Sequence, residues 1–249
     1  MNFEQERRDR VSANGLNQEL RSSAEDFLRK SLSAQYSYNF SWLGRPIIQY
    51  PQDIVALQEL IWQVQPDLII ETGIARGGSL VFSASMLELL ASCTGIEGEV
   101  LGIDIDIRAH NRKAIEEHPL SRRIRMVEGS SIAPEVIAQV RERARGKQRV
   151  LVCLDSNHTH AHVLAELEAY APLTTLDSYC VVFDTIIEDM PESVRDRAWG
   201  RGNNPKTAVQ AYLRSHPEFQ IDASMRNKLL ITAAADGYLK RVAVSPGGV

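Results

Sequence analysis

From residue 51 onward, the chain alternates short apolar runs with longer stretches whose apolar residues recur at helical spacing. Short apolar runs are typical of buried strands, and amphipathic stretches are typical of helices. We expect strands at residues 68–71, 98–104, 124–128, 150–155, 179–184, 219–222 and 228–233. We expect helices at about residues 53–64, 79–90, 109–117, 133–145, 160–171 and 205–215, the first of them capped by Asp53.

This alternation of strands and helices predicts an α/β, Rossmann-like fold. The sheet is expected to be mostly parallel and seven-stranded, with helices on both faces. The pattern contains no internal repeat and no second unit of the same kind. We therefore expect one domain over residues 51–249, preceded by an N-terminal arm over residues 1–50.

The arm has a different pattern from the domain. Residues 1–35 predict a helical extension with imperfectly spaced apolar positions, which is a candidate surface for a homo-oligomer. Residues 36–49 are rich in aromatic side chains and are then interrupted by Gly44 and Pro46, which favours a loop or an edge strand. Such a segment either covers a binding site or anchors the arm on the core, and both alternatives stay open.

Composition excludes several classes of protein. Hydrophobic residues make up 44% and charged residues 24% of the chain, as in ordinary globular proteins, and the net charge of -4 argues against nucleic-acid binding. No apolar run approaches the roughly 20 residues that cross a bilayer, and the first residues contain no apolar secretory core. The three cysteines have no metal-like spacing. We expect a cytoplasmic protein without a membrane partner.

Carboxylates stand at the ends of five consecutive predicted strands. They are Glu71, Asp104, Glu128, Asp155 and Asp184. Because ligands of such sheets bind beyond the carboxyl ends of the strands, these acids are expected to meet at one functional edge.

The turn after the first strand predicts a nucleotide-type cofactor. Its glycines would let the backbone approach a ligand and let the next helix pack on the strand. A dehydrogenase would have Gly-x-Gly-x-x-Gly here, whereas this chain has Ala75 at the second glycine position and Glu71 before the turn. The Glu71 carboxylate would repel a pyrophosphate but suits the cationic methionine end of S-adenosylmethionine. A purely structural glycine turn is the alternative.

Two further segments are candidates for the adenosine end of the cofactor. Asp104, or its competitor Asp106, would accept hydrogen bonds from ribose hydroxyls, and Ser130 would lie beside the adenine. Each of these residues could instead cap the helix that follows it.

Asp155 and Asp184 predict a cation site. Two carboxylates on adjacent strands repel each other unless a cation or a shared proton compensates, and oxygen ligands favour Mg²⁺. Glu188, or its neighbour Asp189, could supply a further oxygen. The alternative is that Asp184 only caps the next turn and binds no metal.

His158 is the candidate general base. It lies three residues after Asp155, and the ordinary histidine pKa of about 6.5 suits proton removal from a hydroxyl. His160 and His162 would point elsewhere if a helix begins near His160, so zinc is not expected. A solvated surface histidine is the alternative. Farther on, the loop at residues 199–207 has a composition typical of segments that fold over substrates, and Lys206 could meet an anionic one.

Six segments carry a resemblance to a known family: residues 42–46, 71–79, 102–106, 155–160, 183–190 and 202–207. Through them the chain resembles the cephalosporin hydroxylase family, whose members are S-adenosylmethionine-dependent O-methyltransferases or close relatives. The resemblance reaches across residues 36–243 and implies a class I methyltransferase fold. A hydroxylase would need an oxidative cofactor site, for which the sequence provides no residues.

The chain is also similar to the broader group of Mg²⁺-dependent O-methyltransferases, including the catechol type. That similarity implies a metal-binding aspartate at Asp155, a second ligand at Asp184 and a basic catalytic residue at His158. The group has a further acid where this chain has Phe183, which cannot bind a metal. The missing ligand would come from Glu188, Asp189 or water.

We therefore predict an S-adenosylmethionine-dependent O-methyltransferase, assisted by Mg²⁺, that acts on a hydroxyl of a sugar or another natural product. Asp155 and His158 are the predicted catalytic residues, and the predicted metal ligands are Asp155, Asp184 and Glu188. The predicted cofactor-binding residues are Glu71, Gly73, Ala75, Ser79, Asp104, Ser130 and Asp155. The rival hypotheses are an NAD-linked oxidoreductase and a non-catalytic relative that binds the cofactor.

Overall fold

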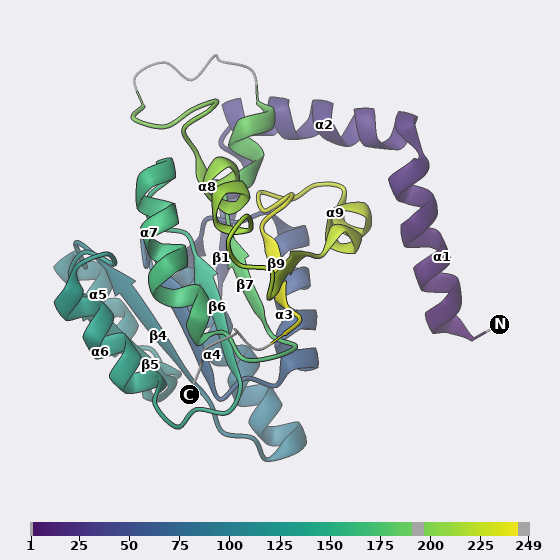
Figure 1. The fold of residues 1–249 in the computed structure, drawn as a ribbon. Helices are drawn as coiled ribbons and strands as arrows, with labels where there is room; N and C mark the ends of the chain where they lie inside the picture. Colours follow the sequence, from purple (N-terminus) through teal and green to yellow (C-terminus); the bar gives the residue numbers. More distant parts are fainter. Residues whose placement is uncertain (1, 191–196, 244–249) are drawn as a thin grey trace.

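The structure is a computed structural model that describes residues 2–190 and 197–243. Its centre is a seven-stranded sheet with the order β5-β4-β3-β6-β7-β9-β8 (Figure 1). The strands are β3 (Leu68–Thr72), β4 (Glu99–Asp104), β5 (Ile124–Glu128), β6 (Val150–Leu154), β7 (Tyr179–Val182), β8 (Phe219–Ile221) and β9 (Tyr238–Arg241). The first five run parallel, and β9 pairs antiparallel with both β7 and β8. The predicted mixed, mostly parallel sheet is confirmed.

Helices cover both faces of this sheet, and each face has its own hydrophobic core. One core joins alternate strand residues such as Ile69 and Leu151 to α3, α4 and α5, and the other joins Ile70 and Val152 to α6, α7 and α8. The helices are α3 (Pro51–Val64), α4 (Gly78–Thr94), α5 (Ala109–Glu116), α6 (Pro134–Ala144), α7 (His160–Tyr170), α8 (Pro205–Tyr212) and α9 (Ala223–Leu229). Single 3-10 turns are η2 (Ser121–Arg123), η3 (Ala171–Leu173) and η4 (Thr185–Asp189). Two apolar faces on the same strands explain why the strand sequences are apolar without interruption.

The predicted strand at 228–233 is wrong. Residues up to Leu229 belong to α9, whose first turn is capped by the Asp222 side chain, which accepts a hydrogen bond from the Ser224 N–H at 3.1 Å. The last strand is β9, which begins only at Tyr238. A short helix that opens on a good capping residue therefore prevails over the strand propensity of the apolar residues that follow.

The predicted role of Asp53 as a helix cap is also wrong. Helix α3 begins after Tyr50 with Pro51 in its first turn, so Asp53 lies inside the helix and is completely buried. Its carboxylate accepts hydrogen bonds from the Thr232 hydroxyl, from the Ala233 N–H at 2.9 Å and from the Tyr238 hydroxyl at 2.9 Å. In the sequence alone, an aspartate near a helix start that binds a distant loop cannot be distinguished from one that caps the helix.

The N-terminal arm consists of α1 (Phe3–Leu16) and α2 (Gln18–Ser33); in Figure 1, α2 runs across the top of the view and α1 turns down its right side, beyond α9. Helix α1 buries no residue, whereas α2 buries Ala24, Leu28 and Ser31. The turn η1 (Tyr36–Asn39) then leads into a separate hairpin of β1 (Phe40–Trp42) and β2 (Arg45–Ile47). Among the described residues, no helix is both long and apolar enough to cross a membrane.

The hairpin anchors the arm on α4. The Trp42 ring meets Phe82 edge-on with ring centroids 5.0 Å apart, and its indole N–H donates to the Ser85 hydroxyl at 2.9 Å. The hairpin also passes close to the start of α4, where a Cβ on Gly78 would lie 2.1 Å from the Pro46 carbonyl oxygen. The aromatic segment is thus a short hairpin, and the described structure supports its role as an anchor.

Candidate active site

A cavity of about 940 Å³ lies at the carboxyl ends of β3, β6 and β7. Its walls come from the glycine turn after β3, the loops after β6 and β7, the segment at residues 197–201 and parts of the arm from Arg29 to Tyr50. Ligand pockets commonly measure 300–1,000 Å³, so a cavity of this size suits a cofactor together with a second molecule. The arm therefore covers the site as well as anchoring on the core.

The glycine turn is built around two close approaches of backbone. Gly73 has a φ of 92°, and a Cβ there would lie 2.1 Å from the Asp155 carbonyl oxygen. Asp104 accepts hydrogen bonds through Oδ2 from the backbone N–H groups of Ile74 at 2.8 Å and Ala75 at 3.1 Å. The turn is thus held by β4 on one side and lies against the loop after β6 on the other.

Glu71 lies beneath this turn and is almost completely buried. Burial raises its pKa to about 7, although the hydrogen bond from the Ser79 hydroxyl opposes that rise. A buried carboxyl with a pKa near neutrality gains stability when a cation arrives beside it, because the cation stabilises its charged form.

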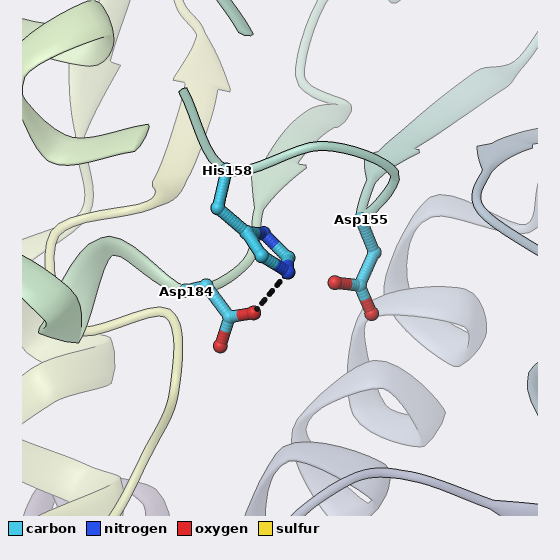
Figure 2. A group of neighbouring side chains, drawn as sticks. All are labelled: Asp155, His158 and Asp184. Carbon is cyan, nitrogen blue, oxygen red and sulfur yellow. Dashed lines mark ion pairs between the residues drawn. The ribbon is translucent and has the colours of Figure 1, made fainter. Parts of the chain in front are cut away.

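Three side chains form a compact cluster at the floor of the cavity. Figure 2 shows the His158 ring between the carboxylates of Asp155 and Asp184. One ligand atom from each residue lies within 4.8 Å of the others, and His158 Nε2 is 3.2 Å from Asp184 Oδ2. Asp155 directly follows β6, while Asp184 follows β7 with a φ of 57°, so neighbouring parallel strands bring them together.

The two carboxylates influence each other electrostatically. Removal from water, the nearby charge of Asp184 and the charge of Glu71 raise the pKa of Asp155 well above its usual range. Such a pair needs a shared proton or a cation. Two carboxylates and an imidazole within reach of one point fit a divalent cation, and the oxygen donors fit Mg²⁺.

The three histidines of this region diverge, as predicted. The His158 ring faces the acid cluster and also meets the Trp199 ring edge-on, with centroids 5.3 Å apart. His160 Nδ1 lies 2.8 Å from the Thr207 hydroxyl, and His162 Nε2 lies 3.0 Å from the Ser131 hydroxyl. Only His158 among them lines the cavity.

The structure brings together some predicted cofactor residues and not others. Gly73, Ala75, Ser79 and Asp155 line the cavity, and Glu71 contacts it through Ser79. Asp104 and Ser130 are not among the lining residues. Asp104 instead fastens the glycine turn, and the Ser130 carbonyl accepts from the Ala133 N–H at 2.9 Å.

Glu188 does not join the acid cluster. Its carboxylate accepts hydrogen bonds from the Gly202 N–H at 2.7 Å and from the Asn204 side-chain amide. Burial acts to raise the pKa of Glu188, but these hydrogen bonds outweigh it and lower the pKa. Glu188 thereby holds the loop that follows. Phe183, at the position of the missing acid, is buried and contributes an apolar wall.

Lys206 does not reach the cavity either. Its ammonium group binds Asp189 at 2.8 Å and Asp236 at 2.7 Å, and it is absent from the lining. The sequence analysis did not identify the arginines that line the cavity, which are Arg29, Arg76, Arg197 and Arg201 among the described residues. A signal was available for two of them, because Arg76 lies in the glycine turn and Arg201 lies in the loop at residues 199–207 that was expected to fold over a substrate.

Comparison with known proteins gives a family and curated relatives. The family described as rhamnosyl O-methyltransferase/CmcI matches residues 34–242. The chain is similar to a rhamnosyl O-methyltransferase of Mycobacterium leprae (strain TN), with 30% identity over 203 residues that cover 81% of this chain and 82% of that protein. It is also similar to a rhamnosyl O-methyltransferase of Mycobacterium bovis BCG, with 32% identity over 195 residues, covering 76% and 73%.

Solved structures share the architecture. A CmcI structure with Mg and SAM has a TM-score of 0.56 at 20% identity, covering 83% of this chain and 78% of that one. The apo structure of CalS11, described as a TDP-rhamnose 3'-O-methyltransferase, has a TM-score of 0.50 at 18% identity and covers 86% of each chain. At these identities the likeness shows the fold, which is that of class I methyltransferases.

Proposed function

Because this chain belongs to the rhamnosyl O-methyltransferase/CmcI family of S-adenosylmethionine-dependent methyltransferases, we propose that it methylates a hydroxyl group of a sugar, with rhamnose as the first candidate. The curated relatives carry rhamnosyl O-methyltransferase in their names, which supports a sugar acceptor. Family membership places the chain among O-methyltransferases, which argues against the rival hypothesis of an NAD-linked oxidoreductase. The cavity then has to accommodate the cofactor and the acceptor side by side.

The glycine turn is the proposed cofactor side of the cavity. Gly73, Ala75 and Ser79 offer backbone and hydroxyl contacts there, and the buried carboxylate of Glu71 offers a negative charge to the cationic methionine end. Asp104 acts through the turn, since both of its contacts at Oδ2 are backbone N–H groups of Ile74 and Ala75.

Asp155 and Asp184 are the residues proposed to hold Mg²⁺. Their oxygens belong to the same cluster as His158 Nε2, and the mutual repulsion that raises the pKa of Asp155 supports a partner with positive charge there. When bound there, the ion would supply charge that makes a nearby hydroxyl more acidic. Water completes the coordination in this proposal, in keeping with the waters that Mg²⁺ commonly retains and with the distance of Glu188 from the cluster.

His158 is the proposed base for the methyl transfer. Its imidazole accepts the proton of the acceptor hydroxyl while the hydroxyl oxygen forms a bond to the methyl carbon. The bond between that carbon and the sulfonium sulfur breaks at the same time, leaving a methyl ether and S-adenosylhomocysteine. The carboxylate of Asp184, 3.2 Å from His158 Nε2, stabilises the imidazolium that results.

The observation that carries this proposal is the placement of Asp155, His158 and Asp184 in one cluster beside the glycine turn. The test is methyl transfer from S-adenosylmethionine to a panel of neutral rhamnosides, sugar phosphates and other sugars, with Mg²⁺ and with a chelator. We expect chelation to abolish transfer, and we expect His158→Gln to lower kcat by about 10²- to 10⁴-fold, the usual contribution of a general base.

The matched control is His110→Gln, which changes an exposed histidine of α5. It should leave kcat unchanged. Transfer that persists in the chelator contradicts the metal assignment, and an active His158→Gln enzyme contradicts the base. If no sugar of the panel is methylated while the cofactor binds, the acceptor class is wrong.

Two expectations from the sequence stay predictions: a homo-oligomer and a cytoplasmic location. Light scattering on the purified chain measures the first, and fractionation of the producing cell measures the second.

A further inference from the structure

The charged residues that line the cavity are distributed unevenly. The acids among the described lining residues are Asp155 and Asp184, both in the proposed metal cluster, and the lining contains no Glu or Lys. Among the same described residues, the arginines are four, at positions Arg29, Arg76, Arg197 and Arg201. A cation bound to the two aspartates would leave the described part of the wall with an excess of positive charge.

These arginines divide between the two sides of the cavity. Arg76 belongs to the glycine turn and lies on the side proposed for the cofactor. Arg197 and Arg201 come from the loop before α8, and Arg29 comes from α2 of the arm. The last three come from elements outside the glycine turn that is proposed to bind the cofactor.

The loop that carries Arg197 and Arg201 is held in place from within. The Asn203 amide donates to the Ala198 carbonyl at 2.8 Å, the Asn204 amide donates to the Gly200 carbonyl at 2.8 Å, and Gly202 is bound to Glu188. A loop fixed by hydrogen bonds presents its side chains at low entropic cost.

The two arginines of this loop are available to a ligand. Among the residues that the structure describes, no carboxylate forms an ion pair with either of them within 4.0 Å, although the charge of Arg201 helps to lower the pKa of Glu188, whereas Arg29 is paired with Asp26. The Arg197 guanidinium instead lies 4.4 Å from the centroid of the Trp199 ring. A planar guanidinium with free donors is suited to bidentate binding of phosphate oxygens.

Trp199 contacts both Arg197 and the proposed base. Its ring centroid lies 5.3 Å from that of His158 and 4.4 Å from the Arg197 guanidinium. The guanidinium therefore lies no farther from the His158 ring than these two separations combined, so one small ligand could contact both.

We propose that Arg197 and Arg201 form an anion subsite that binds a phosphate or diphosphate group attached to the sugar acceptor. The acceptor is then an activated or phosphorylated sugar rather than a neutral glycoside. This inference rests on the proposed function for the sugar, but the subsite itself binds the phosphate portion whether or not methyl transfer follows.

The test is binding without turnover. Calorimetry on the protein loaded with S-adenosylhomocysteine, at constant excess Mg²⁺, measures the affinity for rhamnose 1-phosphate, a nucleoside diphosphate and methyl rhamnoside. We expect both phosphorylated probes to bind more tightly than methyl rhamnoside. Tighter binding of the nucleoside diphosphate assigns a diphosphate-linked acceptor, and tighter binding of rhamnose 1-phosphate assigns a monophosphate.

Variants connect that binding to the loop. Arg197→Ala and Arg201→Ala should each weaken the phosphorylated probes by about 10- to 100-fold, the range for lost hydrogen bonds to a charged group, and should leave S-adenosylhomocysteine binding unchanged. Arg145→Ala is the control, because Arg145 is exposed, pairs with Glu142 and does not line the cavity. Because the phosphorylated probes bind Mg²⁺ equally in every experiment, a difference in affinity between variants reflects the arginines alone.

Three results would overturn the subsite: phosphorylated probes that do not bind, probes that bind both arginine variants as tightly as the unchanged protein, or variants that lose the cofactor instead. A failed subsite leaves the methyl-transfer assay standing, because the panel of that assay also contains neutral rhamnosides. Equally, an inactive enzyme that still binds the phosphorylated probes through Arg197 would refute the proposed function alone.

Discussion

At the residue scale, Glu71 combines burial with a pKa near neutrality. Burial raises that pKa to about 7, so the carboxyl is largely ionised at pH 8 and largely protonated at pH 6. If Glu71 faces the cationic end of S-adenosylmethionine, only its ionised form attracts the cofactor. The affinity should then fall as the pH falls through 7, by up to about tenfold per pH unit.

Glu71→Gln tests this assignment. The variant should bind S-adenosylmethionine more weakly at pH 8 and should lose the pH dependence between 6 and 8, as measured by calorimetry. Glu117→Gln, an exposed acid after α5, is the matched control and should titrate like the unchanged protein. An unchanged pH profile in Glu71→Gln would mean that this carboxyl does not face the cofactor.

Individual site residues were predictable where strand topology positions them. Asp155 and Asp184 each follow a buried strand, and parallel pairing of β6 with β7 brings strand ends together without further information. Glu188 was not predictable in the same way. Its partners Gly202 and Asn204 lie in a later loop, and nothing local to Glu188 indicates which of several polar groups it will bind.

At the element scale, the close approach of the glycine turn to the loop after β6 should tolerate no side chain. In Gly73→Ala, the new Cβ would lie 2.1 Å from the Asp155 carbonyl, on a backbone with a φ of 92°. We expect this variant to lose several kcal/mol in the free energy of unfolding, because both strain and a backbone clash must be relieved. Urea denaturation measures the loss.

The matched control for Gly73→Ala is Gly95→Ala. Gly95 has a similar φ of 77° at the end of α4, but nothing lies within 4 Å of its added Cβ. Its cost should be only that of left-handed backbone, about 1–2 kcal/mol. An equal loss of unfolding free energy in the two variants would show that the backbone near Asp155 relaxes to accommodate the new Cβ.

Asp53 illustrates what sequence patterns miss at this scale. Its position in the first turn of α3 is typical of a local helix signal, yet its partners are Thr232, Ala233 and Tyr238, nearly the whole domain away along the chain. The same tertiary contact helps to explain why Thr232 and Ala233, the end of the strand predicted at 228–233, lie in a loop. The strand and helix pattern up to residue 215, by contrast, followed from hydrophobic periodicity.

Asp53→Ala should lower the free energy of unfolding by about 3 kcal/mol or more, since it leaves buried donors without an acceptor. Denaturant titration of this variant beside Asp9→Ala, an exposed acid of α1, measures the difference. A loss no larger than that of the control would mean that water replaces the carboxylate.

At the scale of the whole molecule, the residues on either side of the predicted boundary between the arm and the domain pack together. The boundary predicted at residue 50 has stayed a prediction, and Ile47 and Tyr50 before it are buried in the structure. Helix α1, which buries nothing, ends well before that boundary. A change in hydrophobic pattern indicates where one helix or strand gives way to another, but a domain boundary depends on which residues pack against the core.

Two truncations test the boundary. A chain that begins after residue 17 should unfold at nearly the same temperature and keep its cofactor affinity, because only α1 is lost. A chain that begins at residue 51 should be strongly destabilised, because it lacks the hairpin packed on α4 and part of the cavity wall. Thermal unfolding measures both, and a stable shorter chain that binds cofactor would establish residues 51–249 as an independent domain.

The contact between Gly73 and the Asp155 carbonyl has a consequence for how the two ligands act together. The turn proposed for the cofactor lies directly against the loop proposed for the metal, so a ligand that shifts one segment is expected to affect the other. A free-energy cycle then requires reciprocity: whatever factor the cofactor adds to metal affinity, the metal adds to cofactor affinity. The order in which the two ligands arrive changes the path taken, but not the stability of the loaded enzyme.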